Sequence, residues 1–358
     1  MDANHKKSIL EKYTKSLQSQ ALLSFPDHHE DQSYSTDDET FFYGQQMDCF
    51  DLDAIKISQS MGMRRLHKKT QVFPCPQSPH IRNRGSHTME VANTAKSLAN
   101  ILGLNGSACY AMALGHDLGH TPYGHTGEEV ISEILGCKFR HEIFSVIVSE
   151  KIEREGCGLY LTLQTLSGML KHSRGSSGLE TSGMKEEEKV VMFADKISYI
   201  VADLNDARRL GYIKNKNMPK EIISLGKTPR EMISTLTISL IEESGEKGTV
   251  SFSESQEAND FIVIRNWMYE NFYHKLNHTE HRENLMLAYD EIEKQKVFSA
   301  ISPALLLALL TDTECENIAK EIRLGNKVDF KRTCLGDIYP HLVGKNIFIT
   351  KIPDYLNI

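Results

Sequence analysis

The helical spacing of apolar residues between about Asp51 and Leu210 restricts the fold of this chain most. From Val91 to Leu102, apolar residues recur at i, i+4, i+7 and i+11, which places them on one face of a helix. Gly103 follows, and glycine is typical of helix ends. We expect further helices over residues 107–118, 142–153 and 160–172, and one that starts near residue 186 and runs through residue 203.

The pattern weakens after residue 215. Helices are predicted over residues 219–242, 257–275 and 280–323, and short strands over 249–252 and 347–350. The predicted class is therefore all-α, a helical bundle with additional C-terminal helices and at most a small β-hairpin. We divide the chain into an N-terminal helix and acidic arm (1–50), a central core (51–215) and a C-terminal helical region packed on that core (216–358).

Composition excludes several classes of protein. The net charge of −7 disfavours bulk binding of nucleic acid. Seven scattered cysteines without a C-x-x-C pair argue against a zinc ribbon and fit a reducing cytosol. The N-terminus lacks the apolar segment of a signal peptide, and the longest apolar run, 297–310, is too short to span a bilayer. We expect a cytoplasmic protein with no membrane partner.

Four residues suggest a metal site: His87, the adjacent His116 and Asp117, and Asp195. Imidazole and carboxylate are suitable ligands for a divalent first-row metal. A single histidine in a helix is more often structural than a ligand. A carboxylate inside an apolar helix, as expected for Asp117, is costly without a partner, however, and a metal is one such partner.

The segment that follows is rich in groups that transfer protons. His120 and His125 lie in LGHTPYGHTGEE, with Glu128 three residues beyond the second histidine. In a helix, that spacing lets the Glu128 carboxylate hold the His125 imidazole and raise its pKa. The alternative is an ordinary enrichment of glutamate at a helix N-terminus, which applies more to Glu129 than to Glu128.

Several motifs in one order resemble the deoxyguanosine-triphosphate triphosphohydrolase-like branch of the HD superfamily, whose members are dNTP triphosphohydrolases. The resemblance covers about residues 51–210. The motifs are MRRLHKKTQVFP (63–74), IRNRGSHTMEVANTAKSLA (81–99), ALGHDLGHTPYGHTGEE (113–129), FRHE (139–142), LTLQTLSGMLKH (161–172) and VVMFADKISYIVADLNDA (190–207).

The resemblance implies a role for individual residues. It implies metal ligation by His87, His116, Asp117 and Asp195. It implies that His125 and Glu128 form a catalytic dyad, with His120 near the α-phosphate. The substrate contacts that it implies are Arg84 for phosphate, Gln71, Tyr199 and Asp203 for the deoxyribose, and His141, Lys171 and His172 near the phosphates.

The implied activity is hydrolysis of a dNTP, with dGTP favoured, to a deoxynucleoside and inorganic triphosphate. The cofactor would be a divalent metal among Mn, Mg, Fe, Co and Zn, with Mn favoured, and relatives form homo-oligomers, often hexamers. Lys196 and Ala202 depart from the residues common in the family and leave base preference open. Two alternatives remain: another HD phosphohydrolase acting on a different nucleotide, and a non-catalytic regulator that binds nucleotide or single-stranded DNA.

Overall fold

The computed structural model describes residues 48–73, 80–173, 179–213, 218–295 and 298–356, together with Leu17, Ala21 and Ser78. These residues form an all-α fold, as predicted, and their one β-type contact is an isolated bridge between Thr70 and Asn83. The helix expected near the N-terminus and the acidic arm after it lie almost wholly outside the described residues.

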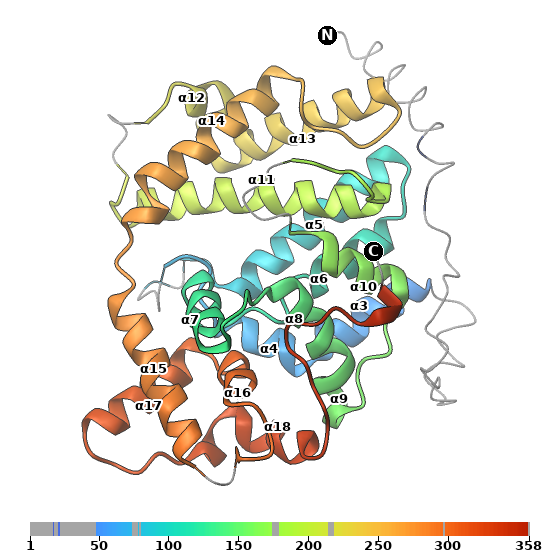
Figure 1. The fold of residues 1–358 in the computed structure, drawn as a ribbon. Coiled ribbons are helices and arrows are strands. Elements are labelled where there is room, and N and C mark those ends of the chain that lie inside the picture. The colour runs from blue at the N-terminus through green and yellow to red at the C-terminus, as the bar shows by residue number, and fades with distance from the viewer. Residues whose placement is uncertain are drawn as a thin grey trace.

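Helices α5 (Arg84–Leu102), α6 (Gly106–Gly115) and α11 (Glu186–Arg209) pack against one another at the centre of the molecule (Figure 1). Asn83 begins α5 because its side chain accepts a hydrogen bond from Ser86 N. Gly103 ends the same helix in the left-handed conformation, with φ 75°. The predicted stop at this glycine is confirmed.

Two helix boundaries differ from the prediction. Helix α6 ends at Gly115, so His116 and Asp117 lie in the turn after the helix and not inside it. The predicted helix over residues 142–153 is divided into α8 (His141–Ile147), a π-helical turn (Val148–Ile152) and the short α9 (Glu153–Gly156). Glu153 caps another segment by accepting from Met61 N and Gly62 N, which favours the break at this position.

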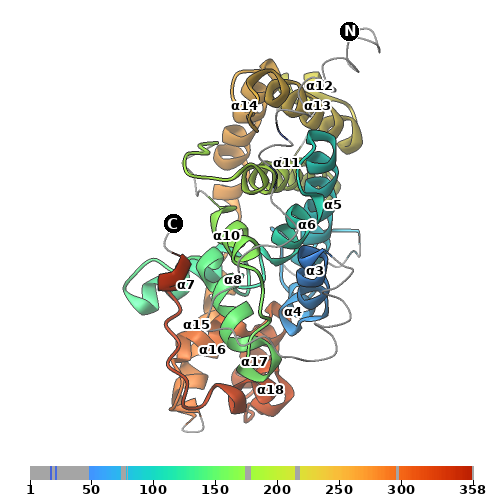
Figure 2. The same cartoon turned by 90° about the vertical axis from the view of Figure 1, so that its right-hand side faces the viewer.

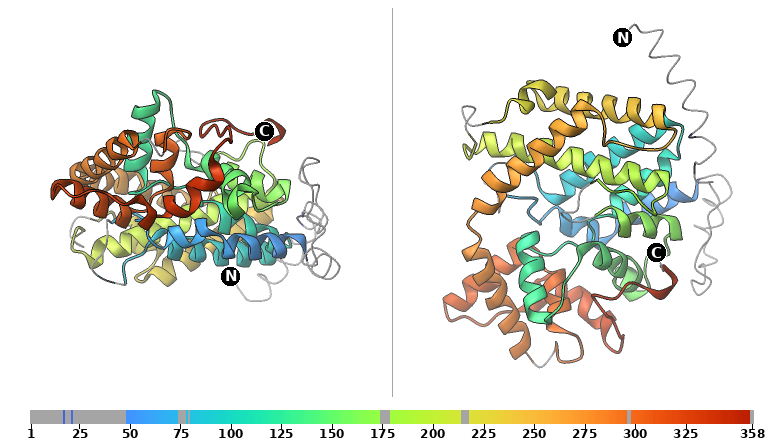
Figure 3. Two further views of the ribbon diagram at one scale, coloured as in Figure 1. Left: turned by 90° about the horizontal axis from the view of Figure 1, so that it is seen from below. Right: turned by 45° about the horizontal axis from the view of Figure 1, so that its top comes forward.

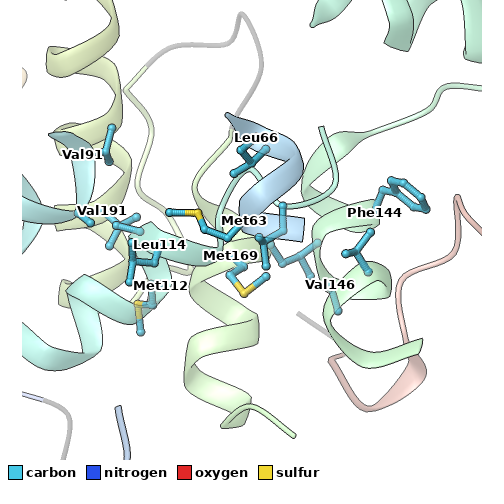
Figure 4. Packing of buried hydrophobic residues seen from close by; sticks show 14 of the residues in the cluster. Met63, Leu66, Val91, Met112, Leu114, Phe144, Val146, Met169 and Val191 are labelled. Carbon is cyan, nitrogen blue, oxygen red and sulfur yellow. The ribbon is translucent and has the colours of Figure 1, made fainter. Parts of the chain in front are cut away.

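Shorter helices complete the core. Their bounds are α3 (Cys49–Gln59), α4 (Met61–Leu66), α7 (His125–Leu135) and α10 (Leu163–Lys171). The turn after α6 packs tightly on α8, since a Cβ on Gly119 would lie only 2.2 Å from Ser145 N. Figure 4 shows the apolar packing around this region, with Met63, Leu114 and Met169 among the buried side chains.

The C-terminal helices lie on two sides of this core. Figure 2 shows α12 (Glu221–Leu225), α13 (Pro229–Lys247) and α14 (Gln256–Asn271) beyond α11 at one end of the molecule. At the other end lie α15 (Thr279–Lys294), α16 (Pro303–Leu309), α17 (Asp312–Arg323) and α18 (Cys334–Leu342). Helix α7 packs against α15 and α16. Figure 3 shows this end of the molecule from below and in a view tilted by 45°.

The strands predicted at 249–252 and 347–350 are wrong, because both segments are described and neither pairs as a strand. Val250 N is instead held by the carboxylate of Glu186. The single helix expected over 280–323 is three helices, since Pro303 and the capping residue Thr311 each begin a new one. None of the helices that the structure describes combines the length and apolar character needed to cross a bilayer.

Candidate metal centre and active site

Three helices bring the four predicted metal ligands together. His87 lies in the first turn of α5, His116 and Asp117 follow α6, and Asp195 lies in α11. His87 Nε2 is 3.0 Å from Asp195 Oδ1. His116 Nε2 is 3.8 Å from that oxygen and 3.6 Å from Asp117 Oδ1. The two histidines and Asp117 are almost fully buried.

The orientation of these groups fits a divalent cation. His116 Nδ1 lies 2.6 Å from the carbonyl oxygen of Ala113 and donates to it, which leaves Nε2 with a lone pair that points toward the carboxylates. Burial opposes the charge on Asp195, but the adjacent imidazoles of His87 and His116 lower its pKa, so the carboxylate is ionised. Two imidazoles and two carboxylates form a donor set that suits Mn, Fe, Co or Zn.

Arg84 places a positive charge beside this group. Its guanidinium donates to Asp117 Oδ2 over 2.7 Å, and the side chain is 5% exposed. A Cβ on Gly124 would lie 3.0 Å from the same guanidinium and 3.6 Å from the carbonyl oxygen of Gln71. Arg84 and Gln71 therefore flank the loop that leads to His125.

Glu128 holds two histidines at once. Its Oε2 accepts from His125 Nδ1 over 2.9 Å, and its Oε1 accepts from His141 Nδ1 over 2.7 Å and from His141 N over 2.9 Å. The His125 side chain is 75% exposed, so Nε2 is open to solvent. Burial would lower the pKa of His141, but the Glu128 carboxylate raises it to about 9.

His120 lies between the metal ligands and this pair. Its ring stacks on that of His141 with centroids 4.4 Å apart, and it meets the His125 ring edge to face at 5.6 Å. Burial and the nearby Arg84 lower the pKa of His120 well below its ordinary value. His120 is therefore a neutral imidazole beside a charged one.

The structure separates Lys171 from this group and places His172 in it. The Lys171 amine is held by the carboxylate of Glu188 at 3.2 Å and by the carbonyl oxygen of Gly183. His172 Nε2 is 3.2 Å from His141 Nε2 and belongs to a potential ligand group with His116 and Asp117. The resemblance implied that both Lys171 and His172 lie near the phosphates.

Tyr199 and Asp203 follow Asp195 on one face of α11 at steps of four residues. Asp203 Oδ2 accepts from Tyr273 Oη over 2.6 Å, and burial raises the pKa of Asp203 to about 7. Tyr199 is half-buried, next to Tyr269.

Sequence analysis missed the partners of this face. The same four-residue spacing occurs on α14 and the turn after it, at Arg265, Tyr269 and Tyr273. Arg265 and Tyr269 interact with Tyr199, and Tyr273 interacts with Asp203. That repeat of basic and aromatic residues was the available signal.

The chain is similar in sequence to known proteins of one family. The model of the HD domain family matches residues 84–200. A deoxyguanosinetriphosphate triphosphohydrolase-like protein of Clostridium perfringens (strain SM101 / Type A) is 40% identical over 230 residues, which cover 63% of this chain and 67% of the relative. One of the same name from Caldanaerobacter subterraneus is 41% identical over 226 residues, covering 63% and 65%. The chain belongs to the deoxyguanosinetriphosphate triphosphohydrolase-like family of HD-domain phosphohydrolases.

Proposed function

We propose that this chain hydrolyses deoxynucleoside triphosphates, with dGTP favoured, to a deoxynucleoside and inorganic triphosphate. The observation that carries the proposal is the pair of potential ligand groups that share His116, one with His87 and Asp195 and the other with Asp117 and His172. Arg84 lies beside Asp117, and the rings of His120 and His125 meet in the loop that follows. The names of the relatives support the substrate class.

The four ligands would hold one divalent cation, with Mn favoured. Such a cation supplies Lewis-acid stabilisation of an α-phosphate oxygen and acidifies a water molecule. Arg84 would bind phosphate oxygens, since a guanidinium matches them with two parallel N–H groups. The ion pair with Asp117 holds the Arg84 side chain in place for this contact.

His125 is the proposed acid/base residue. Cleavage between the α-phosphorus and the sugar 5′-oxygen releases an alkoxide, which needs a proton to leave. The hydrogen bond from Nδ1 to Glu128 fixes the imidazole and leaves Nε2 free to deliver that proton. The neutral His120 and the charged His141 would bind the phosphate oxygens beside it, while Lys171 would act only at the edge of the site.

The sugar would lie along α11. Gln71 and Asp203 would bind the deoxyribose, and the Tyr199 ring would occupy the space that a 2′-hydroxyl needs. The hydrogen bond from Tyr273 fixes the Asp203 carboxyl group in one orientation. This arrangement would select against ribonucleotides by steric exclusion.

We further propose that the enzyme acts in the cytoplasm as a homo-oligomer, with a hexamer as the assembly to test first and with residues 51–215 as its catalytic core. Exposed apolar side chains on α12–α14, namely Ile223, Ile238 and Val263, support a subunit contact at that end of the molecule. Size-exclusion chromatography with light scattering tests this assembly, and a monomer at micromolar concentration would contradict it.

Product analysis tests the function. Purified protein is incubated with each dNTP and Mn²⁺, and the products are separated by anion-exchange chromatography. We expect deoxynucleoside and intact inorganic triphosphate. Pyrophosphate with a monophosphate, or orthophosphate with a diphosphate, would instead indicate a different HD phosphohydrolase, and binding without any product would indicate a non-catalytic regulator.

A further inference from the structure

The loop between the metal ligands and His125 has an unfavourable backbone. Tyr123 has a φ of 55°, and Gly124 follows with φ 60° and ψ −130°. A non-glycine residue in the left-handed region is strained and persists only when its surroundings hold it. The Thr121 hydroxyl donates to the carbonyl oxygen of Gly124, but this bond lies within the loop and does not place it.

Asp312 holds the loop from outside. It is the first residue of α17, and its side chain is almost completely buried. Its Oδ1 accepts from Tyr123 N over 2.8 Å, and its Oδ2 accepts from Thr70 N over 2.7 Å. One carboxylate thus ties the loop to the segment that carries Gln71.

Lys69 makes a second connection. The residue is 2% exposed, and its amine donates to the carbonyl oxygen of His120, at the start of the loop, and to that of Ala308 in α16. Both groups that fix the loop, the Lys69 amine and the Asp312 carboxylate, are therefore buried and lie at the junction of α16, α17 and the segment before α5.

The side chain of Tyr123 completes the contact. Its ring stacks on His281 of α15 with centroids 4.5 Å apart and planes 11° apart. Its hydroxyl donates to the carbonyl oxygen of Asp312 over 3.2 Å and accepts from Asn284 Nδ2 over 3.4 Å. Helices α15, α16 and α17 together therefore fix residues 120–124.

We propose that Asp312 and Lys69 are positioning residues, which set the catalytic geometry of His120 and His125 through this loop. The inference rests on the proposed function. The hydrogen bonds described for these two side chains go to backbone atoms of the loop and of Thr70 and Ala308, and not to the metal ligands. The C-terminal helices would thus help to set the catalytic geometry. The residues proposed to bind the metal, bind the substrate or transfer protons nevertheless all lie before residue 204.

The test is Asp312→Asn, which keeps the volume but replaces one acceptor oxygen by an amide, so either Tyr123 N or Thr70 N loses its acceptor. We expect kcat to fall about tenfold or more, with KM and bound metal unchanged. Lys69→Met should likewise lower kcat and leave KM and the bound metal unchanged.

Glu243→Gln is the matched control, because the buried Glu243 carboxylate accepts hydrogen bonds from the backbone N–H groups of Ser253 and Glu254, far from the site. It should lower the melting temperature and leave kcat unchanged.

Hydrogen exchange gives a readout that needs no substrate. In Asp312→Asn, amides of residues 119–127 should exchange faster than in the wild type, and those of α13 should not. Tyr123→Phe offers a milder variant, which keeps the backbone contact and should retain most of kcat. An unchanged kcat or unchanged exchange of the loop in Asp312→Asn would overturn the proposal. If the wild type hydrolyses no dNTP, the proposed function fails while loop exchange still decides whether Asp312 holds the loop.

Discussion

Replacing Glu128 by glutamine tests the proposed catalytic pair with a change of a single side-chain group. The Glu128 carboxylate accepts from His125 Nδ1 and from both the ring and the backbone of His141. A glutamine can keep the two contacts to His141 through its oxygen, but its amide nitrogen then faces the N–H of His125. A hydrogen bond to a charged group contributes about 1.5–3 kcal/mol. Losing the orientation of His125 should therefore lower kcat by about tenfold to about 150-fold.

Glu129 provides the control for this variant. It is the next residue of α7, its side chain is 69% exposed, and its carboxylate lies 3.7 Å from the Arg282 guanidinium. Glu129→Gln should keep kcat within twofold of the wild type. The assay is steady-state release of inorganic triphosphate from dGTP, with bound metal measured on the same samples. A Glu128→Gln enzyme with normal kcat, or one that has lost its metal, would refute the assigned role.

Three further predictions concern phosphate, sugar and pH. Arg84→Lys should raise the KM for dGTP about tenfold, and an unchanged KM would argue against phosphate binding. Tyr199→Ala should bring the rate on GTP close to that on dGTP, so an unchanged ratio would remove the steric proposal. Burial raises the pKa of Asp203 from its ordinary value of 3.8 to about 7, so ionisation opposes folding increasingly as the pH rises from about 4 to about 7. Asp203→Asn should raise the free energy of unfolding by up to about 4 kcal/mol at pH 8 and by nothing at pH 4; equal effects at both pH values in denaturant titrations would contradict this.

Local signals in the sequence accounted for most of the helical core. The apolar period between Val91 and Leu102 predicted α5, and Gly103 predicted its end. The break of α8 was not predicted, because it depends on Glu153 accepting from backbone groups some 90 residues earlier in the chain. Strands were predicted near residue 250 from residue type alone, whereas a carboxylate on α11 satisfies that backbone.

The sequence could name candidate site residues from their types and motifs, but not the contacts between them. His87, His116 and Asp195 form one potential ligand group, and Asp117 belongs to a second one with His116 and His172. That the four predicted residues hold one metal stays a prediction. The sequence named both Lys171 and His172 but could not show that they point in different directions, since the direction of a side chain at a helix end depends on the packing around it. Contacts between residues far apart in the sequence could not be predicted either. The Asp312 carboxylate, for example, accepts a hydrogen bond from Thr70 N, 242 positions earlier in the chain.

Anomalous diffraction tests the metal centre most directly. Crystals grown with Mn²⁺ would be measured at the manganese absorption edge. We expect one peak per chain, enclosed by the imidazoles of His87 and His116 and the carboxylates of Asp117 and Asp195. A chain saturated with Mn²⁺ that shows no peak between those four side chains would contradict the proposed metal centre and the hydrolysis that depends on it.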